Sequence, residues 1–296
     1  MRIATFIWSF LVFFHASGQT EHEISTFASK AEILFRSEYL NRYRIKSIQG
    51  LYSTKTDGDI IRPSQRSYFF EFNKHGQLIK EYRAAYGDTV FHTYDYDAEF
   101  RISRTRCSDK YGAYLYNYDY DSQGRLISKE YRRSKDTVPD PYFFYLDSTF
   151  TQSVEKFSYI EMQEGTYMKQ YLNENGKVYL EELHFFDSKQ RSIHRESHTL
   201  NGTSRTEVDI SYNEKGLLSA IENLVLMPNE IRTRQEIEYD ENENRLSERR
   251  YRNGEYKTEV QYVFNSDTYL PEAIIWRDVK TNNLTIADFI NFQFFQ

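Results

Sequence analysis

One short motif recurs along most of the chain and constrains its fold more than any other feature. An aromatic residue or Leu followed by Asp or Asn opens a polar turn nine times, at steps of 24, 24, 26, 26, 14, 26, 27 and 25 residues. Asp and Asn side chains bind backbone groups two residues further on, so this motif reverses the chain. Regular reversals predict stacked hairpins. The pairs are Phe72-Asn73, Tyr96-Asp97, Tyr120-Asp121, Leu146-Asp147, Leu172-Asn173, Phe186-Asp187, Tyr212-Asn213, Tyr239-Asp240 and Phe264-Asn265.

The residues on either side of these turns alternate with the period of a β-strand. Tyr114, Tyr116, Tyr118 and Tyr120 share one parity, and polar or aliphatic residues occupy the other. In four turns a Gly follows, which accepts the positive φ of a tight reversal; these are Gly76, Gly124, Gly176 and Gly216. The chain therefore reads as an all-β protein, an antiparallel meander of repeated hairpins.

Nine turns at this spacing predict roughly sixteen to twenty strands. Because strand twist accumulates, we expect the sheet to coil into an elongated ribbon or half-shell. Tyr94 and Tyr118 are expected to line one continuous, inner face. The short step between Leu172 and Phe186 predicts a lone strand, after which the turns emerge on the opposite edge.

The N-terminal region reads as a leader followed by a cap. Residues 1–18 have a basic start, an apolar stretch and small residues, as in a secretory signal peptide, and no Cys lies nearby for a lipid anchor. Residues 19–43 form an N-terminal cap segment, with a short helix expected after Ser25. Residues 44–296 form the β-repeat domain. No further apolar run is long enough to cross a membrane as a helix, so we expect a secreted, periplasmic or cell-surface protein.

Charge and cysteine content exclude several classes of protein. The net charge of −6 becomes one unit more negative if Arg2 leaves with the leader, and this balance argues against a nucleic-acid partner. The single cysteine, Cys107, permits no internal disulfide. It reads as a small apolar residue in a strand, because no partner base is signalled nearby.

The unit Tyr116-Asn-Tyr118-Asp-Tyr120-Asp121-Ser-Gln-Gly124-Arg-Leu126 resembles the YD repeat of Rhs-type and teneurin-like surface proteins. The likeness extends over roughly residues 44–276 at a weaker level. It implies an extended β-sheet that spirals into a shell or displays a surface for partners and glycans. The chain is too short for a closed cocoon, so only the architecture is expected to carry over.

Two motifs resemble metal sites, and both have a simpler explanation. Asp119, Asp121, Gly124 and Glu130 nearly match a calcium loop, but the flanking sequence predicts strands where an EF-hand needs helices. His194 and His198 are spaced for zinc on a helix, yet they also lie in strand-like sequence. We expect no metal, no cofactor and no catalytic residue.

Three functions remain open. The first is a secreted, non-enzymatic binding or structural module, whose Tyr-rich sheet face takes a polysaccharide or a protein. The alternative is an outer-membrane β-barrel, which needs one apolar face per strand. Residues 125–131 offer no such face. A glycan-degrading enzyme is the third, without a recognisable pair of catalytic carboxylates.

Overall fold

The computed structural model describes residues 35–85, 88–109, 112–134, 149–162, 166–202, 204–226 and 230–296. The expected leader, the helix expected after Ser25 and the Leu146-Asp147 turn lie outside these residues. The described chain opens with a short helix, α2 (Ser37–Arg42). No helix in the described ranges has the length and the apolar character that crossing a bilayer requires.

A single antiparallel sheet of 18 strands makes up the rest of the described chain, in agreement with the number expected from the turns. The strands are β1 (Ile45–Lys55), β2 (Arg62–Phe72), β3 (Leu78–Ala85), β4 (Asp88–Tyr96), β5 (Ile102–Asp109), β6 (Gly112–Tyr120), β7 (Leu126–Ser134), β8 (Thr149–Glu161), β9 (Thr166–Leu172), β10 (Val178–Phe186), β11 (Ser192–Thr199), β12 (Arg205–Tyr212), β13 (Leu218–Leu226), β14 (Glu230–Tyr239), β15 (Arg245–Arg252), β16 (Glu255–Phe264), β17 (Pro271–Asp278) and β18 (Leu284–Phe294).

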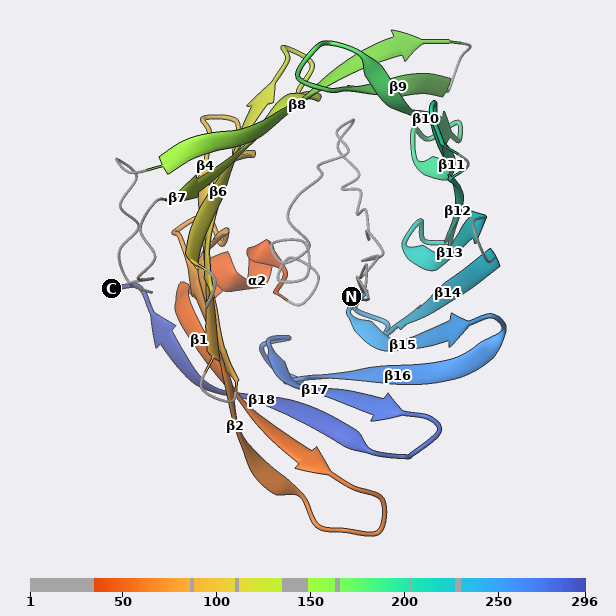
Figure 1. The fold of residues 1–296 in the computed structure, drawn as a ribbon. Coiled ribbons are helices and arrows are strands. Elements are labelled where there is room, and N and C mark those ends of the chain that lie inside the picture. The colour runs from red at the N-terminus through yellow and green to blue at the C-terminus, as the bar shows by residue number, and fades with distance from the viewer. Residues whose placement is uncertain are drawn as a thin grey trace, which may run out of the picture.

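The sheet closes on itself. Each strand pairs with the next along the chain, and β1 also pairs antiparallel with β18, from Ile45 opposite Phe294 to Lys55 opposite Leu284. Figure 1 looks into the resulting ring. The meander was predicted correctly, but the open ribbon or half-shell was wrong. Closure satisfies the backbone groups that two free edge strands would leave unpaired.

A bulge beside each tight turn helps to bend the sheet. The strand pairing slips where the aromatic residue of the motif enters the turn, for example between Asp119 and Tyr120 opposite Leu126. A bulge bends its strand and increases the local twist. Most of these slips occur near the same end of the barrel, so their bends add up around the ring. The others at that end lie at Glu71/Phe72, Asp95/Tyr96, Phe185/Phe186, Ser211/Tyr212, Glu238/Tyr239 and Val263/Phe264, and the slip beside the 173–177 turn, at Val178/Leu180, lies at the opposite end.

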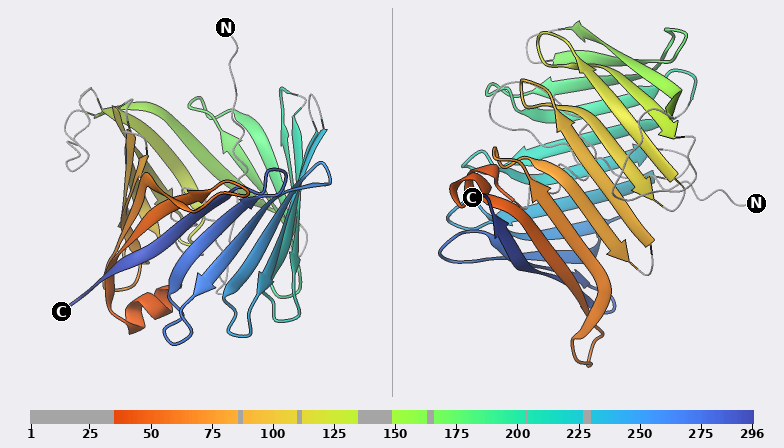
Figure 2. Two further views of the ribbon diagram at one scale, coloured as in Figure 1. Left: turned by 90° about the horizontal axis from the view of Figure 1, so that it is seen from below. Right: turned by 90° about the vertical axis from the view of Figure 1, so that its left-hand side faces the viewer.

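The short step in the repeat is a lone strand, as predicted. It is β10, with the 173–177 turn at one end and the 187–191 turn at the other. The turns after β10 lie on the opposite edge from the 173–177 turn, as predicted, although they share that edge with the turns before β7. Three strands, β7 to β9, separate the 121–125 turn from the 173–177 turn, so only the latter lies at the far end. Figure 2 shows the two rows of turns at opposite ends of the barrel.

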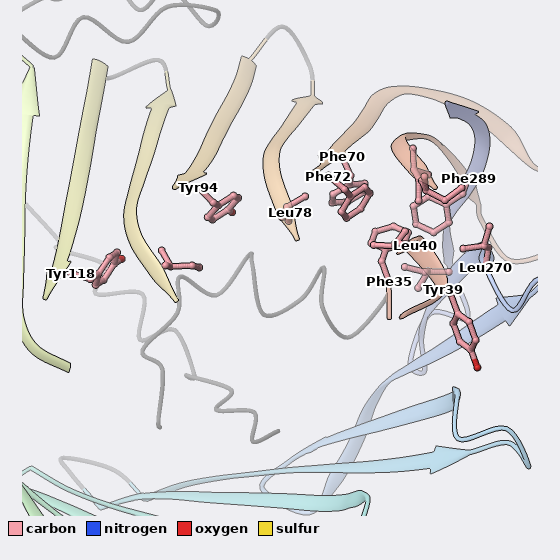
Figure 3. Packing of buried hydrophobic residues seen from close by; sticks show 14 of the residues in the cluster. Phe35, Tyr39, Leu40, Phe70, Phe72, Leu78, Tyr94, Tyr118, Leu270 and Phe289 are labelled. Carbon is pink, nitrogen blue, oxygen red and sulfur yellow. The ribbon is translucent and has the colours of Figure 1, made fainter. Parts of the chain in front are cut away.

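The two faces of the sheet carry different side chains. Phe35, just before α2, is 2% exposed and packs edge-on against Phe70, Phe72 and Phe289. Since α2 lies within the ring in Figure 1 and near one end in Figure 2, these aromatic residues point inward. Figure 3 shows Tyr94 and Tyr118 on this same side of the sheet. The expected continuous inner face is therefore confirmed.

Candidate functional site

The repeated turn is held by its Asp or Asn side chain. Asp121 Oδ1 accepts hydrogen bonds from the backbone N–H of Gln123 at 2.9 Å and of Arg125 at 2.8 Å, and Oδ2 accepts one from Arg125 Nε at 2.8 Å. Asn73 makes the same two backbone bonds in its own turn. Gly124 has a φ of 79°, as the sequence predicted. These hydrogen bonds engage the carboxylate of Asp121, which is one of the acidic groups in the calcium-loop pattern.

A row of inward-facing tyrosines braces the end of the barrel where most of these turns lie. The hydroxyl group of Tyr120 on β6 donates a hydrogen bond of 2.8 Å to the carbonyl oxygen of Ile102 on the neighbouring strand β5. The arginine at the end of one turn lies over the tyrosine ring of the next turn. The guanidinium carbon of Arg101, for example, lies 4.6 Å from the centre of the Tyr120 ring. Burial raises the pKa of Tyr120. Equivalent hydroxyl bonds join Tyr96 to Leu78, Tyr159 to Leu126, Tyr212 to Ser192 and Tyr239 to Leu218.

Towards the other end, aromatic and basic side chains share the inner face. The rings of Tyr52 and Tyr68 lie 4.7 Å apart, and Trp276 lies 6.1 Å from Tyr52. The guanidinium group of Arg66 lies 5.3 Å from the centre of the Tyr52 ring, and that of Arg83 lies 5.9 Å from Tyr68. We call these five residues the Tyr52 cluster. Burial raises the pKa of the Tyr52 hydroxyl.

A second group of inner aromatic residues lies on β6 and β7. Tyr116 stacks on Tyr131 with ring centres 5.1 Å apart, and Tyr114 meets Tyr131 edge-on at 5.9 Å. Lys129 lies 5.2 Å from the Tyr116 ring. The tyrosines combine a flat apolar ring with a hydroxyl group, and Lys129 adds a positive charge, which suits contact with a hydrated ligand that contains rings.

Buried carboxylates on the inner face are matched by nearby cations. Glu248 is 1% exposed and pairs with Arg245 at 3.6 Å and with Arg250. Burial raises the pKa of Glu182, but the hydrogen bond from His184 and the nearby positive charges outweigh it and lower that pKa to about 2. These acids could not be singled out from the sequence, because strand parity alone does not tell which face becomes the inside.

Cys107 has a neighbour that the sequence did not reveal. The register places His92 of β4 opposite Cys107 of β5, with Nε2 3.9 Å from Sγ. Burial, with a contribution from Arg83, lowers the pKa of His92 to about 3. The imidazole is therefore neutral at physiological pH and provides no positive charge to stabilise a thiolate.

The outer face carries ladders of opposite charge. Glu236, Arg249, Glu259 and Arg277 occupy paired positions on β14 to β17. Arg277 pairs with Glu259, and Arg249 Nη2 lies 3.0 Å from Glu238 Oε1. Other arginines have the same outward parity on their strands: Arg104, Arg106, Arg132, Arg205, Arg232 and Arg234.

The two histidines of the zinc-like spacing belong to this outer face. His194 and His198 lie on β11, where His194 contacts Asp209 at 2.7 Å and Glu196 at 3.3 Å. Burial lowers the pKa of His194, but hydrogen bonds to these two carboxylates outweigh it and raise that pKa. Among the described residues, no group of three or more His, Cys, Asp or Glu is placed to hold a metal ion.

No protein-family model matches the chain, and neither does any curated protein. Among solved structures, it is similar to porin-like proteins from Bacteroides uniformis (12% identity, 85% of this chain and 97% of the other, TM-score 0.37) and Bacteroides vulgatus (10%, 81% and 96%, TM-score 0.34). A LolA superfamily protein from Nitrosomonas europaea also matches (12%, 91% and 94%, TM-score 0.21). Likenesses at this level do not establish a function.

The comparisons and the fold correct the resemblance drawn from the turn motif. The similar solved structures named above are porin-like and LolA-superfamily proteins, not YD-repeat proteins of the Rhs type. The sheet also closes through β1 and β18, whereas the resemblance implied a spiralling shell. The motif is a local solution for a tight hairpin turn, so sharing it does not imply a shared overall fold. In its described residues, the protein is a closed β-barrel of 18 strands.

Proposed function

We propose that this protein is a β-barrel of the cell envelope that holds a ligand against its inner, aromatic face. The observation that carries the proposal is the clustering of aromatic side chains on the inner face, opposite the ionic ladders of the outer face. Barrels of 16–18 strands are generally wide enough to leave a channel. Tyrosine side chains that line such a channel offer a ligand flat apolar surface with polar tips.

The outer face favours water as its surroundings. In a membrane barrel, an outward arginine or lysine at the bilayer midplane costs about 2–4 kcal/mol. Arg234 and Arg249 lie in neighbouring strands of the outer face, among the carboxylates of Glu222, Glu236 and Glu238. A location in the periplasm or outside the cell leaves these groups hydrated. The leader expected at residues 1–18 supports export from the cytoplasm.

An outer-membrane β-barrel is the second candidate, and the closed fold favours it over an open surface module. Closure leaves each strand of the described sheet paired on both sides, which is the condition for spanning a bilayer with strands. The even number of strands also falls within the range of bacterial membrane barrels. In this setting the ionic ladders have to lie outside the hydrocarbon layer.

A spin label separates the two settings. In a Cys107→Ser background, a label at outward position 222 on β13 is compared with one at inward position 116. We expect the outward label to be accessible to a water-soluble nickel chelate, and the protein to leave the membrane fraction in carbonate. An outward label accessible to oxygen but not to the chelate, with retention in the membrane, establishes the outer-membrane candidate.

The proposal makes the protein a binder without catalytic activity. The Cys107–His92 pair brings a thiol and an imidazole together on the inner face, but the lowered pKa of His92 makes it a weak base for that thiol. Cys107→Ser is therefore expected to leave ligand binding unchanged. Ligands are sought with glycan arrays and with pull-downs on the full chain, comparing Tyr116→Ala with outward Arg234→Gln. Equal binding by these two variants, or no ligand at all, contradicts an inner binding face.

A further inference from the structure

We propose that α2 obstructs one end of the barrel, so that a ligand reaches the inner face through the other end. The obstructed end is called the turn end, because the β2–β3, β14–β15 and β16–β17 turns lie there. The other is called the loop end and carries the 56–61 and 279–283 connections. The inference rests on the proposed function, because it names the route to the proposed inner binding face.

One side of α2 packs firmly against the wall of the barrel. Phe35, just before the helix, is 2% exposed and meets aromatic rings of β2 and β18 edge-on. Leu40 is 1% exposed and belongs to the same buried cluster, part of which Figure 3 shows. The β2–β3 turn is closer still, since a Cβ atom added to Gly76 would lie 2.6 Å from the backbone oxygen of Ser37. The helix and this turn are therefore in direct contact.

The other side of α2 reaches turns beyond the closure of the barrel. Arg36 Nη1 donates a hydrogen bond of 3.0 Å to the carbonyl oxygen of Asn242 in the β14–β15 turn. The ring of Tyr39 lies 5.7 Å from that of Tyr269 in the β16–β17 turn. Because β2 and β14 to β17 lie on opposite sides of the β1–β18 pairing, α2 spans this pairing inside the ring. A barrel of this size generally leaves a channel, so a helix placed here narrows one of its two ends.

The contacts beyond the closure are weaker than the packing on the first side. The hydrogen bond from Arg36 is exposed to solvent, and so is the bond of 3.4 Å from Tyr43 Oη to the carbonyl oxygen of Asp267. Exposed hydrogen bonds contribute little net stability, because water replaces them readily. α2 has only six residues and no side-chain hydrogen bond at its N-cap, so it has little stability of its own. It is therefore anchored firmly on one side and held lightly on the other.

The loop end leads directly to aromatic residues of the Tyr52 cluster. Trp276 lies near the end of β17 that continues into the 279–283 connection, and its side chain is half-buried. Its ring lies 6.1 Å from that of Tyr52 on the inner wall. A ligand that enters at the loop end therefore meets flat aromatic surfaces close to the entrance.

The test compares how readily thiol reagents of two sizes reach the two ends of the interior. In a Cys107→Ser background, Tyr239→Cys places a thiol on the inner face at the turn end, and Trp276→Cys places one near the loop end. The rate with a bulky polyethylene-glycol maleimide is divided by the rate with a small methanethiosulfonate reagent, which corrects for local burial. We expect this ratio to be lower at position 239 than at position 276.

Gly76→Ala displaces α2, because the added Cβ atom collides with Ser37, and Gly176→Ala is its matched control. The two glycines have nearly the same positive φ, 75° and 73°, but a Cβ atom at position 176 meets nothing within 4 Å. Both substitutions therefore strain the backbone, and only the first moves the helix. We expect Gly76→Ala to raise the ratio at position 239 about tenfold, the change in population that follows from losing about 1.4 kcal/mol of contacts. Gly176→Ala should leave the ratio unchanged.

Three results overturn the inference. If position 239 reacts with the bulky reagent as readily as position 276, the turn end is open. If neither position reacts with it, the loop end is not an entrance. If Gly76→Ala and Gly176→Ala change the ratio at position 239 equally, α2 does not obstruct that end.

Arg36→Gln removes the hydrogen bond to Asn242 and replaces Gly76→Ala if that variant does not fold. None of these measurements uses the ligand. The proposed inner binding face is tested separately with Tyr116→Ala, so a wrong route of entry and a wrong binding face give different results.

Discussion

Replacing Asp121 with Ala tests whether the repeated carboxylate stabilises a turn. The change removes two hydrogen bonds from backbone N–H groups and the contact with Arg125. A net contribution of about 1 kcal/mol for each backbone bond, with less than about 1 kcal/mol for the partly exposed ion pair, predicts a loss of roughly 2–3 kcal/mol in the free energy of unfolding. Urea denaturation followed by circular dichroism measures this loss.

Asp121→Asn is the matched control, because sister turns already use Asn. Asn73 and Asn173 accept the same two backbone bonds without a charge. We therefore expect Asp121→Asn to lose only the ion pair, a decrease of less than about 1 kcal/mol. If Asp121→Asn destabilises the protein as much as Asp121→Ala, or if Asp121→Ala has no effect, the carboxylate does not serve the turn in this way.

The same carboxylate predicts a dependence on pH. Burial raises the pKa of Asp121, but hydrogen bonds from Arg125 and Gln123 and the charge of Arg125 outweigh it and hold that pKa below its usual value. A carboxyl group with a lowered folded pKa stabilises the protein above its unfolded pKa, near 3.9, and loses this effect as the pH falls through the folded value. The stability difference between the wild type and Asp121→Ala should therefore shrink below about pH 4.

Further predictions follow from the turns, the N-terminal contact and the closure. EDTA should leave the melting temperature unchanged, because Asp121 is engaged by its own turn; a fall of several degrees that calcium reverses contradicts this. Phe35→Ala should cost about 3–5 kcal/mol in a urea titration, and a loss below about 1 kcal/mol would mean that its inner packing is not retained in solution. Tyr120→Phe should cost about 1 kcal/mol by removing its bond to Ile102, with unchanged stability counting against the tyrosine row. Removing residues 284–296 should expose the edges of β17 and β1 and cause self-association in light scattering, whereas a monomer of unchanged stability would argue against the closed sheet.

The local structure followed from the sequence wherever it depends on neighbouring residues. The Asp121 turn, the positive φ of Gly124 and the alternation of Tyr114 to Tyr120 are short-range effects, and the structure contains them as expected. The lone strand β10 followed from the spacing alone. These features depend on contacts within a few residues, which is the range that a sequence pattern reports.

The proposed binding surface was predictable only in part. A tyrosine-rich face was expected, and Tyr94 and Tyr118 lie on the inner wall. The neighbours of Tyr52 were not expected. Trp276 lies close to Tyr52 only because β17 pairs with β18 and β18 pairs with β1. His92 was missed beside Cys107 for a similar reason, since their contact depends on the register between β4 and β5.

By itself, the sequence determined the class of fold, the turns and the approximate number of strands. Only the tertiary structure decided that the first and last strands meet. A meander of given strands can remain open or close, and the choice depends on accumulated twist, on the bulges beside the turns and on the cost of two unpaired edges. Closure then decides which face becomes the interior, and so which aromatic residues are available to a ligand. That choice is collective because it depends on all the strands together, whereas the turn motif describes one hairpin at a time.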